Sequence, residues 1–321
     1  MQEGYILGID TSNYTSSIAL VDFQSRLVYE KRALLDVKKG ERGLRQSDAL
    51  FQHIRNIPEL FKNIPQFTKG QAIKAVAVSN KPRPIENSYM PVFLAGKSFG
   101  ETIASFLDVN CFSISHQENH LEAAQWSIHK KITKPFLGVH ISGGTTEILY
   151  IRPCQNRYTI EIVGGSRDIS AGQLIDRIGV AMGLAFPCGK SMDIAASQFS
   201  GDYLSLPLSV KEGWINFSGI ETKVQRIVDE NKEMPKASIS KALLLSVAKS
   251  LEKAVLYCSG IWNTNEVLWM GGVASSVVVR GYLQEKLSQQ GLQSYFGKPE
   301  FCTDNGVGTA LLGLYQYLAK P

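Results

Sequence analysis

The feature that most constrains this chain is a strand–turn–strand pattern that occurs twice. In Leu137–Tyr150, an apolar run stops at Ser142-Gly143-Gly144 and a second apolar run begins within three residues. In Tyr5–Asp22, two apolar runs flank the polar turn Thr11–Thr15. Each pattern is typical of a β-hairpin. Because the copies lie far apart, they predict two homologous halves that each offer a polar turn to one cleft.

Length and composition limit the kind of protein. A chain of 321 residues that is 44% hydrophobic can form about two domains. No apolar run approaches the ~18 residues of a membrane span, and no cleavable signal pattern precedes the first strand. The five cysteines are dispersed, odd in number and without a Cys-x-x-Cys pair. These features predict a cytoplasmic protein with no membrane partner, no disulfide framework and no thiolate zinc site.

The charge balance permits a polyanionic partner without requiring one. The net charge is +5 and the sequence pI is about 8.8. Six basic residues fall close together with few acidic neighbours, and both a solvated loop and a nucleic-acid contact remain open for them: Lys31, Arg32, Lys38, Lys39, Arg42 and Arg45.

Periodicity places the remaining elements. We expect an N-terminal subdomain of residues 1–134, joined by the C-terminal helix 307–318, and a C-terminal subdomain of residues 135–306. The first helix, 48–61, has its apolar residues at helical spacing: Leu50, Phe51, Ile54 and Ile57. Further helices are expected at 91–107, 172–184, 190–199, 238–257 and 273–287, and further strands at 27–35, 72–79, 110–114, 159–163 and 266–270.

Two histidines lie at a spacing that suits a metal. Ser115 and Glu118 form a capping-box pattern, which predicts that His116 and His120 lie one turn apart on one helix face. The positive end of the helix dipole disfavours a protonated imidazole there, and a neutral imidazole can bind a metal. A pair of surface histidines is the alternative, but the chain has only five histidines, and we favour the metal. Ser218 and Glu221 predict a second capping box.

The polar turns and a glycine pair suit a nucleotide. Turn amides attract anions, and Gly271-Gly272 before a helix lets backbone approach a flat base or ribose. The chain has no Walker motif and no Rossmann glycine motif, so a nucleotide would use the two-hairpin design.

The order and spacing of eight motifs resemble a known family. The motifs are Ile6 to Ser12, His116-x-x-x-His120, Ser142-Gly143-Gly144, Asp168 through Asp176, Pro187-x-Gly189 with Asp193, Phe217-Ser218-Gly219, Gly271-Gly272-Val273, and Thr303-Asp304-Asn305. Almost end to end, the chain resembles the tRNA threonylcarbamoyladenosine transferases, formerly called O-sialoglycoprotein endopeptidases or glycoproteases. The resemblance implies an α/β fold of two duplicated subdomains like those of actin, sugar kinases and heat-shock ATPases. Each subdomain would have a mixed five-stranded sheet flanked by helices, with a cleft between the two.

The resemblance also implies roles for single residues. One divalent transition metal, iron or zinc, would be bound by His116, His120 and Asp304. An adenylate or ATP-derived nucleotide would be held by Ile141, Ser142, Gly143, Gly144, Asp176, Gly189, Asp193, Gly272 and Ser276. We place Asp10 as a carboxylate that acts on the incoming amine or fixes a water molecule.

The implied reaction transfers a threonylcarbamoyl group from an adenylate to the exocyclic amine of a tRNA adenosine. Partner proteins of the threonylcarbamoyladenosine assembly are also implied. The chain departs from the family pattern at Asn13, Tyr14, Thr15, Thr145, Cys188 and Ser276, as a divergent paralogue would. Two alternatives therefore stay open: a carbamoyltransferase or ATPase of the same superfold with another acceptor, and a non-catalytic nucleotide-binding paralogue that regulates a true family member. A peptidase is the weakest interpretation, because His-Gln-Glu-Asn-His is not the His-Glu-x-x-His arrangement.

Overall fold

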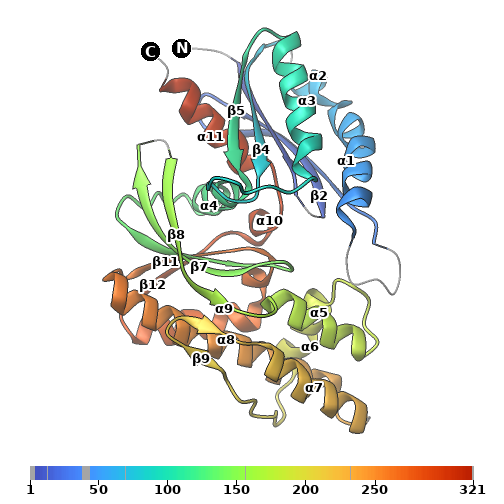
Figure 1. Ribbon diagram of the computed structural model, residues 1–321, viewed down its shortest axis with the longest axis vertical. Helices are drawn as coiled ribbons and strands as arrows, with labels where there is room; N and C mark the ends of the chain where they lie inside the picture. Colours follow the sequence, from blue (N-terminus) through green and yellow to red (C-terminus); the bar gives the residue numbers. More distant parts are fainter. Residues whose placement is uncertain are drawn as a thin grey trace. The chain divides into compact units, whose positions relative to one another are not determined.

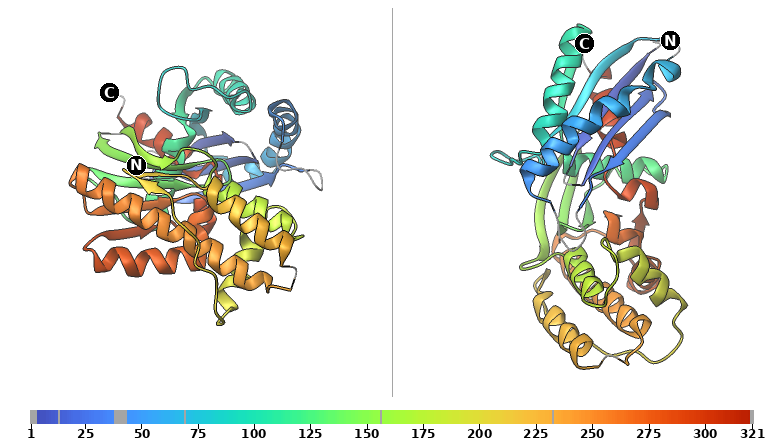
Figure 2. Two further views of the ribbon diagram at one scale, coloured as in Figure 1. Left: turned by 60° about the horizontal axis from the view of Figure 1, so that its bottom comes forward. Right: turned by 90° about the vertical axis from the view of Figure 1, so that its right-hand side faces the viewer.

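The computed structural model describes residues 4–12, 14–37, 44–68, 70–155, 157–231 and 233–319 (Figures 1 and 2). Two compact units divide the chain. Unit 1 comprises residues 1–131, 153–158 and 303–321, and unit 2 comprises residues 132–152 and 159–302. Across the described ranges, no helix is long and apolar enough to cross a membrane.

Unit 1 is a five-stranded mixed sheet with helices on both faces (Figure 1). The strands pair antiparallel from β3 to β1 and parallel from β1 to β5, in the order β3 Leu27–Leu34, β2 Thr15–Asp22, β1 Tyr5–Thr11, β4 Ile73–Lys81 and β5 Asn110–Ser115. The helices are α1 Gln46–Phe61, α2 Ile64–Thr68, α3 Phe93–Phe106, α4 His116–Ser127 and α11 Val307–Leu318. Figure 2 shows α1 and α3 together on one face of this sheet, with α11 on the other.

The close approach of α11 to the unit 1 sheet depends on a glycine. A Cβ atom at Gly8 of β1 would lie 2.5 Å from the carbonyl oxygen of Gly306 and 2.6 Å from the amide nitrogen of Ala310. Only a residue without a side chain fits between the strand and the start of the helix. This packing brings the segment before α11, from the far end of the chain, to the carboxyl end of β1.

Unit 2 repeats the strand order of unit 1 and extends it. Its sheet has the order β12 Gln293–Phe296, β11 Glu266–Met270, β6 Phe136–Ile141, β7 Thr146–Cys154, β8 Arg157–Ser166, β10 Trp214–Ile215 and β9 Val210–Lys211. The first five of these correspond, in order, to β5, β4, β1, β2 and β3 of unit 1. The duplication is confirmed, and the unit 2 sheet exceeds the expected five strands by β10 and β9.

The helices of unit 2 include a long one at its core. They are α5 Ala171–Ala181, α6 Gly189–Gln198, α7 Ser218–Glu230, α8 Lys236–Trp262, the 3₁₀ turn η1 Gly272–Ser275, α9 Val277–Gln289 and α10 Pro299–Cys302. Helix α8 contributes the largest share of the buried apolar side chains of the unit 2 core. It is longer than the 238–257 expected from periodicity.

The buried face of α1 differs from the sequence prediction. Phe51 is 62% exposed and Ile54 is 47% exposed, whereas His53 and Ile57 are buried. His53 determines this orientation, because its Nδ1 lies 2.8 Å from Ser16 Oγ and its Nε2 lies 2.7 Å from the carbonyl oxygen of Ser12. A histidine with two partners in the β1–β2 region outweighs two apolar side chains, because a buried polar group must be hydrogen-bonded.

The predicted capping box at Ser218 is wrong. The N-cap of α7 is Phe217, and it makes no side-chain cap. Instead the carboxylate of Asp168, distant in sequence, accepts the amide protons of Phe217 and Ser218 at 2.9 Å each. Partial burial alone would raise the pKa of Asp168, but these hydrogen bonds, with those from Ile169 and the Ser218 side chain, lower it to about 2. A carboxylate at a helix N-terminus also interacts favourably with the helix dipole.

We therefore predict that Asp168→Ala lowers the free energy of unfolding by about 1–2 kcal/mol, the usual effect of removing an N-terminal cap. Because the pKa of Asp168 is depressed in the folded protein, its contribution is present above the ordinary aspartate pKa and is lost as the pH falls towards 2. Urea denaturation at neutral pH measures the loss. The matched control is Asp229→Ala, which removes an exposed carboxylate from the other end of the same helix and should cost nothing. Equal losses in the two variants would contradict the assigned cap.

Candidate functional site

Helix α4 presents the two histidines as the sequence predicted. Ser115 is the N-cap, and its Oγ accepts the amide proton of Glu118 at 3.3 Å. The Glu118 carboxylate in turn accepts the amide proton of Ser115 at 2.9 Å, which completes the capping box. His116 is consequently the first helical residue, and His120 lies one turn further on the same face.

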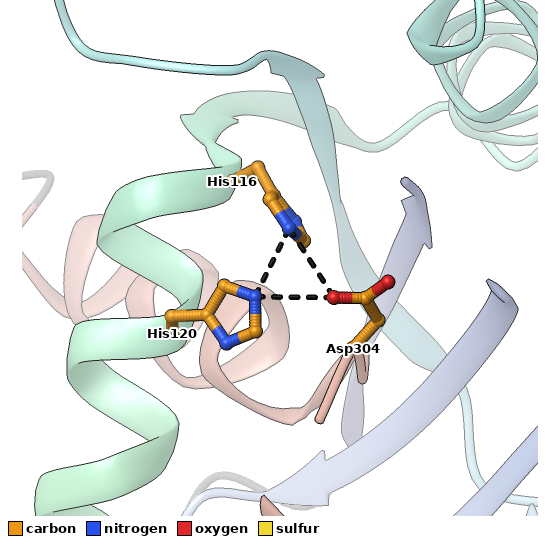
Figure 3. Close-up of side chains that lie close together, drawn as sticks. All are labelled: His116, His120 and Asp304. Carbon is orange, nitrogen blue, oxygen red and sulfur yellow. Dashed lines mark hydrogen bonds and ion pairs between the residues drawn. The ribbon is translucent and has the colours of Figure 1, made fainter. Parts of the chain in front are cut away.

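Three ligand atoms converge at this point (Figure 3). The Nε2 atoms of His116 and His120 are 3.0 Å apart. Asp304 Oδ1 lies 3.5 Å from His116 Nε2 and 3.2 Å from His120 Nε2. Metal bonds of about 2.0–2.2 Å at tetrahedral or octahedral angles hold neighbouring ligand atoms about 3–3.5 Å apart. The three side chains therefore fit one transition metal, and in the described part of the chain they are the one such cluster.

Asp10 lies behind this cluster. It is fully buried at the end of β1, and its Oδ1 accepts a hydrogen bond from His116 Nδ1 at 2.9 Å. Its second oxygen, Oδ2, is also buried and has no hydrogen-bond partner within the described ranges. A carboxylate on Nδ1 fixes the tautomer of a histidine and directs its Nε2 to a metal. The structure thus places Asp10 on the histidine itself, and this contact was not foreseen from the sequence.

The charges of the cluster change the protonation expected from the helix dipole. Burial alone would lower the pKa of His116, but the charge and hydrogen bond of Asp10, followed by those of Asp304, raise it to about 10. At His116 the two carboxylates thus oppose the effect of the helix dipole. At His120, by contrast, burial and the neighbouring His116 charge lower the pKa. The paired histidines hold the pKa of Asp304 well below its usual range despite burial.

In unit 2, the turn between β6 and β7 is closed by two hydrogen bonds between Ser142 and Thr145. The Ser142 amide donates to the Thr145 carbonyl at 2.8 Å, and the Thr145 amide donates to Ser142 Oγ at 3.1 Å. Gly143 and Gly144 are exposed, and an added Cβ at either would meet no atom within 4 Å. Packing within the protein therefore does not require these glycines, which suits a turn that a ligand approaches closely.

The N-terminus of α5 packs against this turn. Ser170 caps the helix with Gln173 as its capping-box partner, and Ser170 Oγ also donates to the Gly143 carbonyl at 2.8 Å. Gly172 lies beneath the turn, since a Cβ there would lie 2.4 Å from the Ser142 carbonyl oxygen. This cap was not predicted from the sequence, where the helix was expected to begin at Gly172, although the Ser-x-x-Gln pattern indicates it. A glycine turn beside a helix N-terminus is a typical anion-binding arrangement.

The other residues assigned to a nucleotide lie in three places in unit 2: at the start of α9, at the start of α6 and at η1. Asp193 Oδ1 accepts from Ser276 Oγ at 2.5 Å, and its Oδ2 accepts from the Val277 amide at 2.8 Å, so Asp193 caps α9. Asp176 instead accepts from the Cys188 amide, next to Gly189, at 2.7 Å, and burial raises its pKa. Gly272 begins η1 with open space around its Cα.

The basic residues of the N-terminal region are partly engaged within the protein. Lys31 Nζ donates to the Glu59 carbonyl at 3.3 Å, and Arg32 pairs with Glu30 and donates to Thr303 Oγ1 at 2.9 Å. Lys38, Lys39 and Arg42, like Asn13 in the β1–β2 turn, lie outside the described residues.

Solved structures of low sequence identity share the fold. The (R)-2-hydroxyglutaryl-CoA dehydratase component A of Acidaminococcus fermentans superposes with a TM-score of 0.59 at 15% identity, and the match covers 99% of this chain and 100% of that one. A ROK family glucokinase from Streptomyces griseus, in complex with glucose and AMPPNP, gives 0.54 at 9% identity, over 97% and 99% of the two chains. The expected actin- and sugar-kinase-like fold is confirmed.

Sequence comparison identifies the family. The sequence pattern of the tRNA N6-adenosine threonylcarbamoyltransferases matches residues 36–311. A protein of that name from Syntrophomonas wolfei is 28% identical, and the match covers 99% of this chain and 94% of the relative. The His116 and His120 helix, the Ser142 turn and Asp304 lie within the matched range. This chain is a member of the tRNA N6-adenosine threonylcarbamoyltransferase family.

Proposed function

We propose that this protein transfers a threonylcarbamoyl group from an adenylate donor to the exocyclic amine of an adenosine in tRNA, with one divalent transition metal bound by His116, His120 and Asp304. The observation that carries the metal is the convergence of three ligand atoms within 3.5 Å of one another. Family membership supports tRNA as the acceptor and a threonylcarbamoyl group as the cargo.

The residues of unit 1 would prepare a metal position with free coordination sites. Asp10 holds His116 by Nδ1, so its Nε2 points to the same place as that of His120. Asp304 adds one carboxylate oxygen, which leaves positions for substrate atoms. A metal held there would supply a Lewis acid that polarises the carbonyl group of the donor. Since Asp10 is fully buried and already bonded to His116, we assign it to positioning rather than to a direct contact with the incoming amine.

The residues of unit 2 would hold the adenylate. The Ser142–Gly144 turn and the N-terminus of α5 would bind its phosphate through backbone amides, which favour the negative charge that develops on the leaving group. The open backbone at Gly189 and Gly272 would face the nucleoside. Asp176 and the Asp193–Ser276 pair are the polar groups that we assign to its hydroxyl and base edges, although Asp193 also caps α9.

The metal centre predicts the behaviour of histidine variants. His116→Ala and His120→Ala should each lower metal affinity by roughly 100-fold or more, because two remaining ligands hold a metal weakly. Metal content of the purified protein and titration with Zn²⁺ measure this loss. The matched control is His129→Ala, which removes an exposed histidine just beyond the same helix and should leave binding unchanged. Retention of metal by both α4 variants would refute the centre.

The adenylate site predicts the behaviour of a glycine variant. Gly172→Ala places a Cβ 2.4 Å from the Ser142 carbonyl oxygen and 2.6 Å from Gly143 Cα, so the turn and α5 must separate. We expect AMP binding, measured by calorimetry, to weaken by about 10-fold or more. Gly260→Ala is the control, because a Cβ there meets nothing within 4 Å. Unchanged AMP affinity in Gly172→Ala would argue against this turn as the phosphate site.

The complete reaction is tested by incubation of the purified protein with threonylcarbamoyl-adenylate, unmodified tRNA and the partner proteins of the threonylcarbamoyladenosine assembly. The expected product is N6-threonylcarbamoyladenosine, detected by mass spectrometry of the digested tRNA, and His120→Ala should abolish it. If the wild-type protein binds metal and AMP yet modifies no tRNA, the tRNA acceptor is wrong. The departure from the family pattern at Thr145 would then favour a different acceptor.

A further inference from the structure

Asn119 lies on α4 between the two histidines and is fully buried. Its Nδ2 donates to the carbonyl oxygen of Asn305 at 2.6 Å, and its Oδ1 accepts the amide proton of Thr309 at 2.9 Å. Both the nitrogen and the oxygen of this side-chain amide are therefore hydrogen-bonded to the segment that follows Asp304, near the C-terminal end of the sequence.

The contact to Thr309 replaces a missing cap. Helix α11 has Gly306 as its N-cap, which has no side chain to offer. Asn305 Oδ1 accepts the amide proton of Val307 at 2.9 Å, and Asn119 Oδ1 accepts that of Thr309. The free amide groups at the start of a helix need such partners when they are buried. Asn119 thus caps α11 from α4.

Helices α4 and α11 pack so closely at Asn119 that no side chain fits at Gly308 of α11. A Cβ at Gly308 would lie 2.0 Å from the carbonyl oxygen of Asn119 and 2.8 Å from its Oδ1. The backbones of α4 and α11 are therefore in direct contact at Asn119. This contact fixes the position of the loop before α11 relative to the first turns of α4.

The three metal ligands differ in how they are positioned. The separation of His116 and His120 follows from the helix they share, whereas Asp304 comes from a loop and has no such constraint. We infer that Asn119 is a positioning residue for Asp304: by bonding to the next residue and to the first turn of α11, it holds the third ligand against the two histidines. This inference rests on the metal centre proposed above.

The test measures the Zn²⁺ dissociation constant of the full-length protein by competition with a chromogenic chelator. Asn119→Ala should weaken binding by about 10-fold or more, as is usual when a group that supports a metal ligand is removed. Asn119→Asp keeps the acceptor for Thr309, and so the helix cap, but loses the donor to Asn305; it should bind Zn²⁺ more weakly than wild type and remain folded. Gln125→Ala is the matched control, since it removes another buried side chain of α4, bonded to Tyr158, and should leave the constant unchanged.

A double-variant cycle separates positioning from general destabilisation. If Asn119 acts through Asp304, then Asn119→Ala should have no further effect on Zn²⁺ affinity in an Asp304→Ala background. An equal loss in both backgrounds, or wild-type affinity in both Asn119 variants, would overturn the inference while leaving the metal centre intact. Failure of the wild-type protein to bind Zn²⁺ would overturn the centre and the role of Asn119 together.

Discussion

The arrangement of unit 1 depends on the hydrogen bond between Asp10 and His116. A fully buried carboxylate is tolerated only where it is paired, and here the partner is an imidazole at the start of α4. The bond joins the end of β1 to the helix after β5, two segments from opposite ends of the N-terminal half. It also sets the ring of His116 so that its Nε2 points to His120 and Asp304. This one hydrogen bond thus fixes a proposed metal ligand, His116, against the end of strand β1.

Side chains distant in sequence cap several helices in both units. Asp168 caps α7, Asp193 caps α9 and Asn119 caps α11. Each of them accepts amide protons at the start of a helix and at the same time ties one segment to another. In unit 1 the segment tied to Asn119 directly follows Asp304, a proposed metal ligand, and in unit 2 the segment tied to Asp193 carries Ser276, which is assigned to the nucleotide. Stability and site geometry therefore depend on the same hydrogen bonds.

This mode of capping explains what could be predicted from the sequence. The repeated hairpins, the α4 capping box and the bounds of α11 follow from local patterns, and the structure has them. The cap at Ser218 failed because Asp168, far away in the chain, takes that role. The buried face of α1 failed because His53 finds partners on Ser12 and Ser16 that periodicity does not reveal. Local patterns such as hairpins and capping boxes can be predicted from a sequence, whereas hydrogen bonds between polar groups far apart in the chain depend on the fold.

The duplicated hairpin shows how one framework supports two chemistries. In unit 1 the first strand ends in Asp10, whose carboxylate is directed at a histidine, and this suits a cation. In unit 2 the equivalent strand, β6, is followed by Ser142 and two open glycines beside the N-terminus of α5, and this suits an anion. The strand order is common to both, so the difference lies in a few residues at the strand end and in the helix packed beside it. Divergence at these positions accounts for part of the difference between the metal site proposed in unit 1 and the phosphate site proposed in unit 2, and the loop that carries Asp304 adds the third proposed ligand in unit 1.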